Sequence, residues 1–405
     1  MTRALALLLF VGTVAAAAPP ATVGGRLPAL PGPSPRTHRG RVQGIGRISG
    51  TRACEGCHSD IAAEWQASLH RQAFTDPVFL SAYAVEPLAF CRGCHAPEAN
   101  AAREPDKRSA AIGVACTTCH VEDHRIVGAP ADRPGKEDAA HPVFADARLA
   151  TAAACSGCHQ FDFPKEAMQR FPEAMQDTAH EHARSGHAKE PCQSCHMPLV
   201  DGVGEGRHKS HVFAVISDPA MIRRAARVQA VRLDGATTEI TIEAADVGHS
   251  FPTGDMFRRL EVRAEALDER GQVIARARPV VLGRTFRDVP RNPIGGDFTM
   301  QRVAGSDSRV SRPGIERVEG VDGTPRASRI ALTLAEPLPD ATIRWSVVYQ
   351  RMSSPMAEAF HVSQVLDEIV VAEGVLAKAG VVVRSGIEIG QRTVEKDTRV
   401  IAKED

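Results

Sequence analysis

Three features are scarce or missing in this sequence of 405 residues, and each one excludes a class of protein. Neither charge is in excess, since Lys and Arg total 49 and Asp and Glu also total 49, so the basic bias typical of nucleic-acid binding is missing. Beyond the first residues, no apolar run is long enough to span a bilayer. No cysteine precedes Cys54, so we expect no lipid-attachment site near the start of the chain.

The start of the chain has the pattern of a secretory signal peptide. Arg3 is followed by an apolar run and then by small residues up to Ala18. A transmembrane anchor is the alternative, but the run is short and rich in alanine. We therefore expect residues 1–18 to be removed, the protein to be periplasmic or secreted, and the Pro- and Gly-rich residues 19–49 to form a linker.

The ten cysteines form five copies of one motif, Cys-x-x-Cys-His. The copies are Cys54, Cys57 and His58; Cys91, Cys94 and His95; Cys116, Cys119 and His120; Cys155, Cys158 and His159; and Cys192, Cys195 and His196. A zinc site needs four N or S ligands from two cooperating cysteine pairs, so an odd number of motifs with a fixed histidine fits zinc poorly. A disulfide in so short a loop restrains little chain entropy and gives the histidine no role. Covalent haem explains every feature, because both thiols add to porphyrin vinyl groups and the adjacent histidine reaches the iron.

The motifs therefore predict five covalently bound haem c groups within about 160 residues, or roughly 30 residues per haem. So short a segment cannot build an ordinary apolar core. We expect residues 50–221 to be a pentahaem domain in which short helices and irregular chain wrap around stacked haems, and the haem-free polypeptide to be largely unfolded there.

The pattern changes after about residue 222. Runs such as TTEITIEA and ATIRWSVVYQ alternate apolar and polar residues, with Gly, Asp and Pro between the runs. This alternation predicts antiparallel strands, so we expect residues 222–390 to form a β-sandwich-like domain, followed by a polar tail over 391–405. A helix is expected at 354–380, where Val362, Leu366 and Ile369 form an apolar stripe. The predicted fold class is α+β.

Each haem iron can take a second histidine, and eleven of the sixteen histidines lie outside the motifs. They are His38, His70, His124, His141, His180, His182, His187, His208, His211, His249 and His361. His70 follows the apolar residues Ile61, Trp65 and Leu69 on a helix expected over 59–74 with Ser59 or Asp60 as N-cap, so it is a strong candidate.

Four further candidates have weaker support. His124 follows the third motif closely and could reach a neighbouring haem, and His187 is taken from the group of His180, His182 and His187 before the fifth motif. His211 is chosen over His208 in GRHKSHVF, and His249 projects from a tight turn containing Pro252 and Gly254. His141, His38 and His361 are weaker candidates.

Several ordered segments resemble one known family. They are CEGCHSDIAAEWQASLHRQAFTDPVF, FCRGCHAPEA, IGVACTTCHVED, CQSCHMP, SHVF and GHSFPTGDMFRRLEV, and together they cover about residues 50–265. The sequence is similar to multihaem c-type cytochromes of the cytochrome c-552/c-554 type that have a β-rich C-terminal domain. The resemblance implies stacked and perpendicular haem pairs with mostly bis-histidine irons, with the five motif histidines as proximal ligands and His70 as a distal one. Catalytic relatives carry a lysine in one motif or a haem-crosslinking tyrosine, and neither signature is evident among these motifs or near Tyr83 and Tyr349.

Two functions follow from these observations. The first is electron transfer between redox proteins, such as a quinol-side donor and a terminal reductase or outer-membrane conduit. The second is an oxidoreductase that acts on a small nitrogen or sulfur compound at one haem with an open iron. The abundant histidines favour the carrier, while the sequence alone does not pair all five haems with a second ligand.

Overall fold

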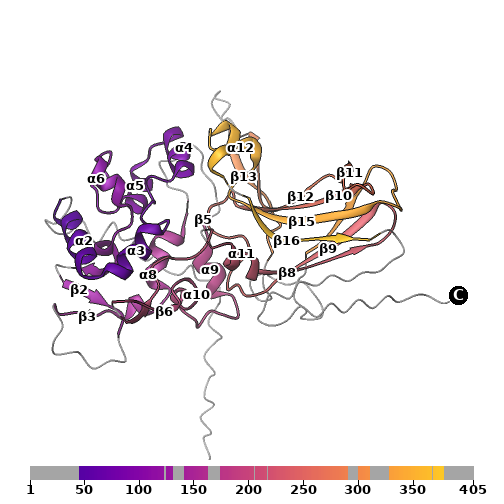
Figure 1. The fold of residues 1–405 in the computed structure, drawn as a ribbon. Helices are drawn as coiled ribbons and strands as arrows, with labels where there is room; N and C mark the ends of the chain where they lie inside the picture. Colours follow the sequence, from indigo (N-terminus) through magenta and orange to yellow (C-terminus); the bar gives the residue numbers. More distant parts are fainter. Residues whose placement is uncertain are drawn as a thin grey trace, which may run out of the picture.

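A computed structural model describes residues 45–122, 125–130, 141–162, 174–204, 206–216, 218–290, 300–310, 328–366 and 368–377. Most helices lie on one side of the molecule and the large sheets on the other, with α9 (Thr178–Ala183) and α11 (Pro219–Arg224) between them and α12 (Ser354–Ala359) beside the sheets (Figure 1). Within these residues, no helix is both long and apolar enough to cross a membrane. The predicted signal peptide, most of the predicted linker and the predicted tail lie outside the described residues.

The haem-motif part consists of short helices. They are α2 (Ile45–Cys57), α3 (Ser59–Ala67), α4 (Pro77–Val85), α5 (Ala89–His95), α6 (Lys107–Ile112), α7 (Cys116–His120), η1 (Ala147–Ala150), α8 (Ala153–His159), α9 (Thr178–Ala183) and α10 (Cys192–His196). Between them lie small strands: β1 (Val121–Glu122), β2 (Arg125–Gly128), β3 (Phe144–Ala145), β4 (Phe161–Asp162), β5 (Ala174–Gln176), β6 (Leu199–Asp201) and β7 (Arg207–Lys209). Helices this short gain little from intrinsic propensity, so tertiary contacts must hold them.

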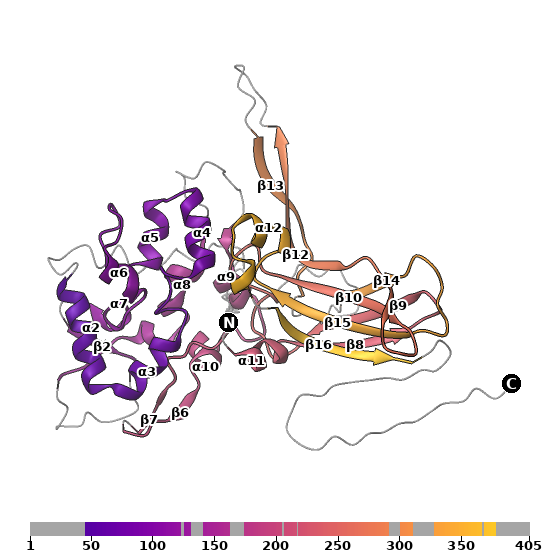
Figure 2. The same ribbon diagram turned by 45° about the horizontal axis from the view of Figure 1, so that its top comes forward.

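Helix α11 (Pro219–Arg224) leads into the second part, which contains two antiparallel sheets. The strands are β8 (Ala226–Arg232), β9 (Thr237–Ala244), β10 (Arg259–Leu267), β11 (Val273–Arg276), β12 (Val280–Pro290), β13 (Met300–Asp307), β14 (Ser328–Thr333), β15 (Thr342–Gln350) and β16 (Ile369–Leu376). One sheet has the order β13-β12-β10-β15-β16 with β11 on β10, and the other has the order β14-β9-β8. The turned view shows β12 and β13 extending away from the rest of the sheet (Figure 2).

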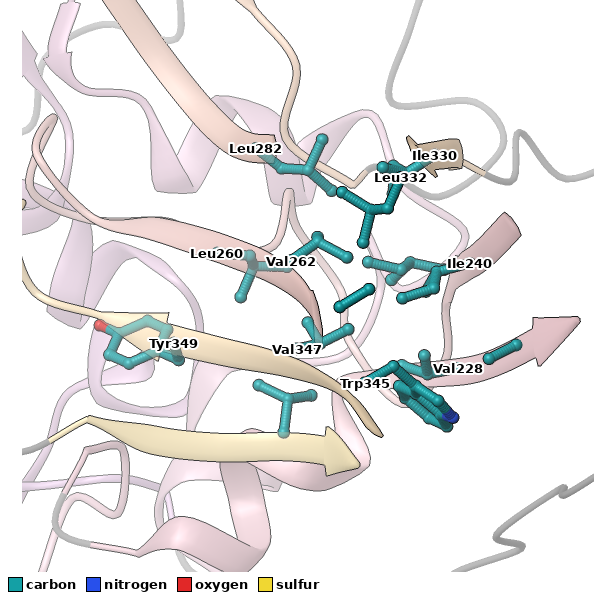
Figure 3. Close-up of a cluster of buried hydrophobic side chains, with 14 of the residues drawn as sticks. Val228, Ile240, Leu260, Val262, Leu282, Ile330, Leu332, Trp345, Val347 and Tyr349 are labelled. Atoms are coloured by element: carbon teal, nitrogen blue, oxygen red, sulfur yellow. The ribbon is translucent and has the colours of Figure 1, made fainter. Parts of the chain in front are cut away.

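The large hydrophobic core lies between these two sheets. Ile240 comes from the small sheet, and Leu260 and Val347 from the large one, and all three side chains are fully buried (Figure 3). The alternating burial along β9 and β10 matches the period-2 sequence pattern that predicted these strands. The expected α+β class is therefore confirmed.

The helical part has only small apolar clusters. Trp65, Ile112 and Ala115 form one of them, and a second is built around Phe74 and Tyr83. Described residues in this part thus provide far less apolar packing than the sheets do, which agrees with a segment whose core is completed by cofactors.

The predicted helix over 354–380 is wrong for most of its length. Only α12 (Ser354–Ala359) and the short η2 (Ser363–Val365) are helical, and β16 takes up the remainder of the apolar stretch. His361 has a positive φ of 55°, which ends the helical path. The β-branched run in β16 pairs with β15, so tertiary strand pairing overrides the helical spacing.

Two boundaries in the helical part also differ from expectation. Helix α3 starts at Ser59, so His58 occupies the N-cap position and makes no side-chain cap, and the helix ends at Ala67 rather than at residue 74. Helix α2 begins at Ile45, within the last residues of the predicted linker. His70 consequently lies in a turn just beyond α3 and not on the helix itself.

Candidate haem-binding site

Each Cys-x-x-Cys-His motif lies at the C-terminal end of a short helix. Helices α5, α7, α8 and α10 end at the motif histidine, and α2 ends at Cys57, one residue before His58. Residues three apart on a helix share one face, so the two thiols of each motif point to the same side. This is the arrangement that attachment to two vinyl groups on one porphyrin edge requires.

Thiols of different motifs are in contact. Three pairs of thiols lie within hydrogen-bonding reach of each other: Cys54 with Cys116, Cys94 with Cys158, and Cys155 with Cys192. The first contact joins motifs one and three, and the other two join motif four to motifs two and five. Cys119 of motif three is also close enough to Cys155 and Cys158 to affect their charge. Motif four is therefore adjacent to motifs two, three and five.

Four of the five motif histidines face a second histidine from elsewhere in the chain. The pairs are His58 with His141, His120 with His211, His159 with His70, and His196 with His249, and the ring centroids lie 6.2, 6.2, 6.2 and 6.3 Å apart in that order. The angles between the ring planes are 65°, 40°, 55° and 9°. The ring centroids of histidines that are distant in the sequence thus lie at nearly the same separation in all four pairs.

That separation fits an iron ion between two imidazoles. A metal–nitrogen bond of about 2 Å on each side, with each nitrogen about 1.1 Å from its ring centre, places two ring centres about 6.3 Å apart. The donor set and the spacing therefore fit bis-histidine haem at four positions.

Hydrogen bonds at the far ring nitrogen hold several of these histidines. The Nδ1 atoms lie near backbone carbonyls: His120 near Val127 at 2.9 Å, His196 near Ala214 at 3.2 Å, His211 near Lys209 at 2.8 Å, and His249 near Ser250 at 3.0 Å. A carbonyl only accepts, so Nδ1 must carry the proton and Nε2 retains the lone pair that a metal needs.

Burial keeps several of these imidazoles neutral. It lowers the pKa of His70 to about 3, with smaller contributions from the charges of His159 and His211. Burial likewise lowers the pKa of His159 and of His249 to about 4. A neutral imidazole is the form that binds a metal, so the environment favours ligation.

His95 of the second motif has a different environment. Its Nδ1 donates to the carbonyl of Ala73 at 2.6 Å, as a ligand histidine would, and the ring of Phe79 stacks on it at 3.7 Å with an angle of 10° between the planes. Among the described residues, no second histidine stands opposite His95 at the separation seen in the other four pairs.

The structure places the remaining candidates as follows. The Nδ1 atom of His187 lies 2.9 Å from Glu190, and its predicted ligand role stays a prediction. His208 lies 3.3 Å from the carboxylate of Glu64, and His124 lies outside the described residues. Of the predicted distal ligands, His70, His211 and His249 are opposite motif histidines.

His141 is the partner that sequence reasoning ranked too low. It precedes a proline, follows a segment with no apolar period, and lies 83 positions from His58. The sequence points to His141 only through a count, because five motif histidines need second ligands from among the eleven histidines outside the motifs.

Comparison with known proteins gives one informative match. No family model and no curated protein matches the sequence. The fold is similar to that of one solved multihaem c-type cytochrome. The solved structure it resembles is a penta-heme cytochrome c552 from Thermochromatium tepidum, at 21% identity and a TM-score of 0.60, with 81% of this chain and 98% of that chain covered. The likeness extends over both the helical part and the sheets, and it shows a shared fold.

Proposed function

We propose that this protein is a pentahaem c-type cytochrome that transfers electrons between redox proteins through closely spaced, mostly bis-histidine haems. The observation that carries the proposal is the separation of 6.2–6.3 Å between four motif histidines and four histidines from distant parts of the chain. When bound, haem supplies reversible one-electron chemistry, and two imidazole ligands leave its iron no position for a substrate.

The ten motif cysteines would hold five haem groups. His58, His95, His120, His159 and His196 would be the proximal ligands, and His141, His211, His70 and His249 would complete four of the irons. In this proposal the helical part wraps stacked haems and the two sheets form a sandwich beside them. Covalent attachment of haem c takes place outside the cytoplasm, which agrees with the predicted signal peptide and a periplasmic or secreted location.

The contacts between motifs support an electron path. Haems attached at neighbouring thiols would lie near each other, so the proximity of Cys54 and Cys116 would keep haems one and three close together. The proximity of Cys158 to Cys94 and of Cys155 to Cys192 would likewise keep haem four close to haems two and five. Haem four would be the branching point of the chain. Donor and acceptor proteins, on the quinol side and at a terminal reductase or outer-membrane conduit, would dock near the outer haems.

A second candidate function rests on His95. Its haem would have no second histidine from the described residues, and an iron with an open position can bind a small nitrogen or sulfur compound. Four bis-histidine haems would then deliver electrons to one reactive haem. This candidate is an oxidoreductase built on the same chain of haems.

Protein-film voltammetry of the purified holoprotein separates these functions. Carrier function predicts a reversible signal that integrates to five electrons per chain and does not change when nitrite, hydroxylamine or sulfite is added. Oxidoreductase function predicts a catalytic reduction current with one of these compounds. A signal of fewer than five electrons, in protein shown by mass to be fully loaded, would contradict the proposed conduction through all haems.

A further inference from the structure

His249 comes from outside the haem-bearing helices. It lies in the segment between β9 and β10, so a residue of the β-rich part is placed opposite the motif histidine His196. Phe251 and Val310 form an antiparallel bridge that ties this segment to the chain after β13. The β-rich part thus fixes one side of the segment.

Glu181 of α9 holds the same segment from the haem side. Its carboxylate accepts a hydrogen bond from the backbone N–H of Ser250 at 3.2 Å and from the hydroxyl of Thr253 at 2.7 Å. Glu181 is only 2% exposed. These bonds secure the chain on the C-terminal side of His249, immediately next to the imidazole.

A buried arginine compensates the charge of this carboxylate. Arg309, whose side chain is 10% exposed, places Nη2 2.8 Å from Glu181 and also donates to the carbonyl of Pro252 at 3.3 Å. Asp307 forms a second ion pair with Arg309. A carboxylate this deeply buried is stable only when it has such partners. The ion pair with Arg309 and the two hydrogen bonds therefore fix the position of Glu181.

The opposite end of α9 is anchored by the β-rich part as well. Arg284 of β12 donates to the carbonyls of Ala174 at 2.8 Å and Met175 at 3.3 Å, just before α9 begins. At Gly248 the chain approaches α9 so closely that an added Cβ would lie 3.1 Å from the His182 ring. Helix α9 and the His249 segment therefore form one tightly packed unit.

We propose that Glu181 is the positioning residue of His249, and that it aims this imidazole at the fifth haem nearly parallel to His196. The inference rests on the proposed ligand role of His249. In this proposal the β-rich part would supply one axial ligand, His249. Its packing with α9 would fix the plane of the His249 imidazole. The 9° angle of this pair, against 40–65° in the other three, is the geometric feature that Glu181 would maintain.

The test uses the holoprotein with Glu181→Ala and Glu181→Gln. The angle between axial imidazole planes sets the splitting of the iron d orbitals, so the pair at 9° gives a low-spin EPR signal different from those of the steeper pairs. In Glu181→Ala we expect this one signal to shift or to convert to high spin, while the other low-spin signals stay unchanged. Glu181→Gln keeps an acceptor for Ser250 and should give a smaller shift of the same signal.

Glu265→Gln is the control, because this glutamate of β10 pairs with Arg276 and Arg344. It should leave every EPR signal in place. If Glu181→Ala lowers the melting temperature but leaves all low-spin signals unchanged, Glu181 has only a structural role and the inference fails. His249→Ala tests the ligand assignment independently of Glu181. If that variant keeps the wild-type number of low-spin haems, His249 is not a ligand.

Discussion

The ring of Phe79 lies flat on the imidazole of His95, with 3.7 Å between the centroids and 10° between the planes. Phe79 is in the first turn of α4, and its backbone N–H donates to Asp76, the N-cap of that helix. The orientation of His95 thus depends on α4 as well as on its own motif. No other motif histidine has a ring stacked on it in this way among the described residues.

Phe79→Leu should change the properties of one haem. Leucine fills part of the volume but cannot maintain the flat contact, so we expect the EPR signal and reduction potential of the His95 haem to shift, with a loss of about 1 kcal/mol in unfolding free energy. Phe144→Leu, at a side chain that is 44% exposed, should change neither. Spectropotentiometric titration of both variants checks this. Equal shifts in several haems would contradict a local role for Phe79.

An ion pair joins the two parts of the protein beside this site. Arg351, just after β15, donates to both carboxylate oxygens of Asp76 at 2.8 and 2.9 Å. Replacing Arg351 by Met leaves a buried carboxylate without its partner and should cost about 2 kcal/mol, measured by chemical denaturation. Arg344→Met is the control, because the ion pair of Arg344 with Glu265 is more exposed than that of Arg351 with Asp76 and should contribute less than about 0.5 kcal/mol.

The same pair predicts a dependence of stability on pH. Burial would raise the pKa of Asp76, but the hydrogen bonds and charge of Arg351 outweigh it and hold the pKa below its ordinary value. The folded protein therefore binds the Asp76 proton more weakly than the unfolded chain does. The stabilisation is present above about pH 4 and is lost as the pH falls below it. Melting temperatures between pH 3 and pH 6 should show a steeper acid-side loss in the wild type than in Arg351→Met, and parallel curves would contradict this.

Phe213 lies between two of the proposed distal ligands. Its ring is edge-on to His70 at 4.2 Å and to His211 at 5.6 Å, and its φ of 50° is rare for a bulky side chain. Phe213→Ala should therefore perturb the haems of motifs three and four together, seen as shifts in two low-spin EPR signals. Phe161→Leu, whose ring pairs with Phe90, is the control. A change confined to one haem would show that Phe213 supports only one ligand.

Haem loss should affect the two parts of the protein differently. The main hydrophobic core belongs to the β-rich part, while the described residues of the helical part form clusters of a few residues. A chain expressed without haem attachment should lose helical circular dichroism and leave a protease-resistant fragment containing the sheets. Complete digestion, or a helical part that resists cleavage as well as the sheets do, would contradict this division.

The local features of this protein could be predicted from the sequence, and the long-range ones only in part. The Cys-x-x-Cys-His spacing is a covalent requirement, and the strand alternation reflects burial on one face, so both are visible in short windows. His70, His211 and His249 each lie in a short stretch of sequence whose pattern favoured a ligand role. His141 had none, since its position opposite His58 depends on how a distant segment folds. The stretch at 369–376 was mistaken for helix because strand pairing with β15 is not visible in its own spacing.

The pairing of histidines is tested most directly by quantitative low-temperature EPR of the oxidised holoprotein and of four variants, His70→Ala, His141→Ala, His211→Ala and His249→Ala. Each variant should lose a different low-spin signal and gain high-spin iron equal to one haem per chain, with the remaining signals preserved. A variant that keeps the wild-type low-spin count, or two variants that lose the same signal, would contradict the pairing.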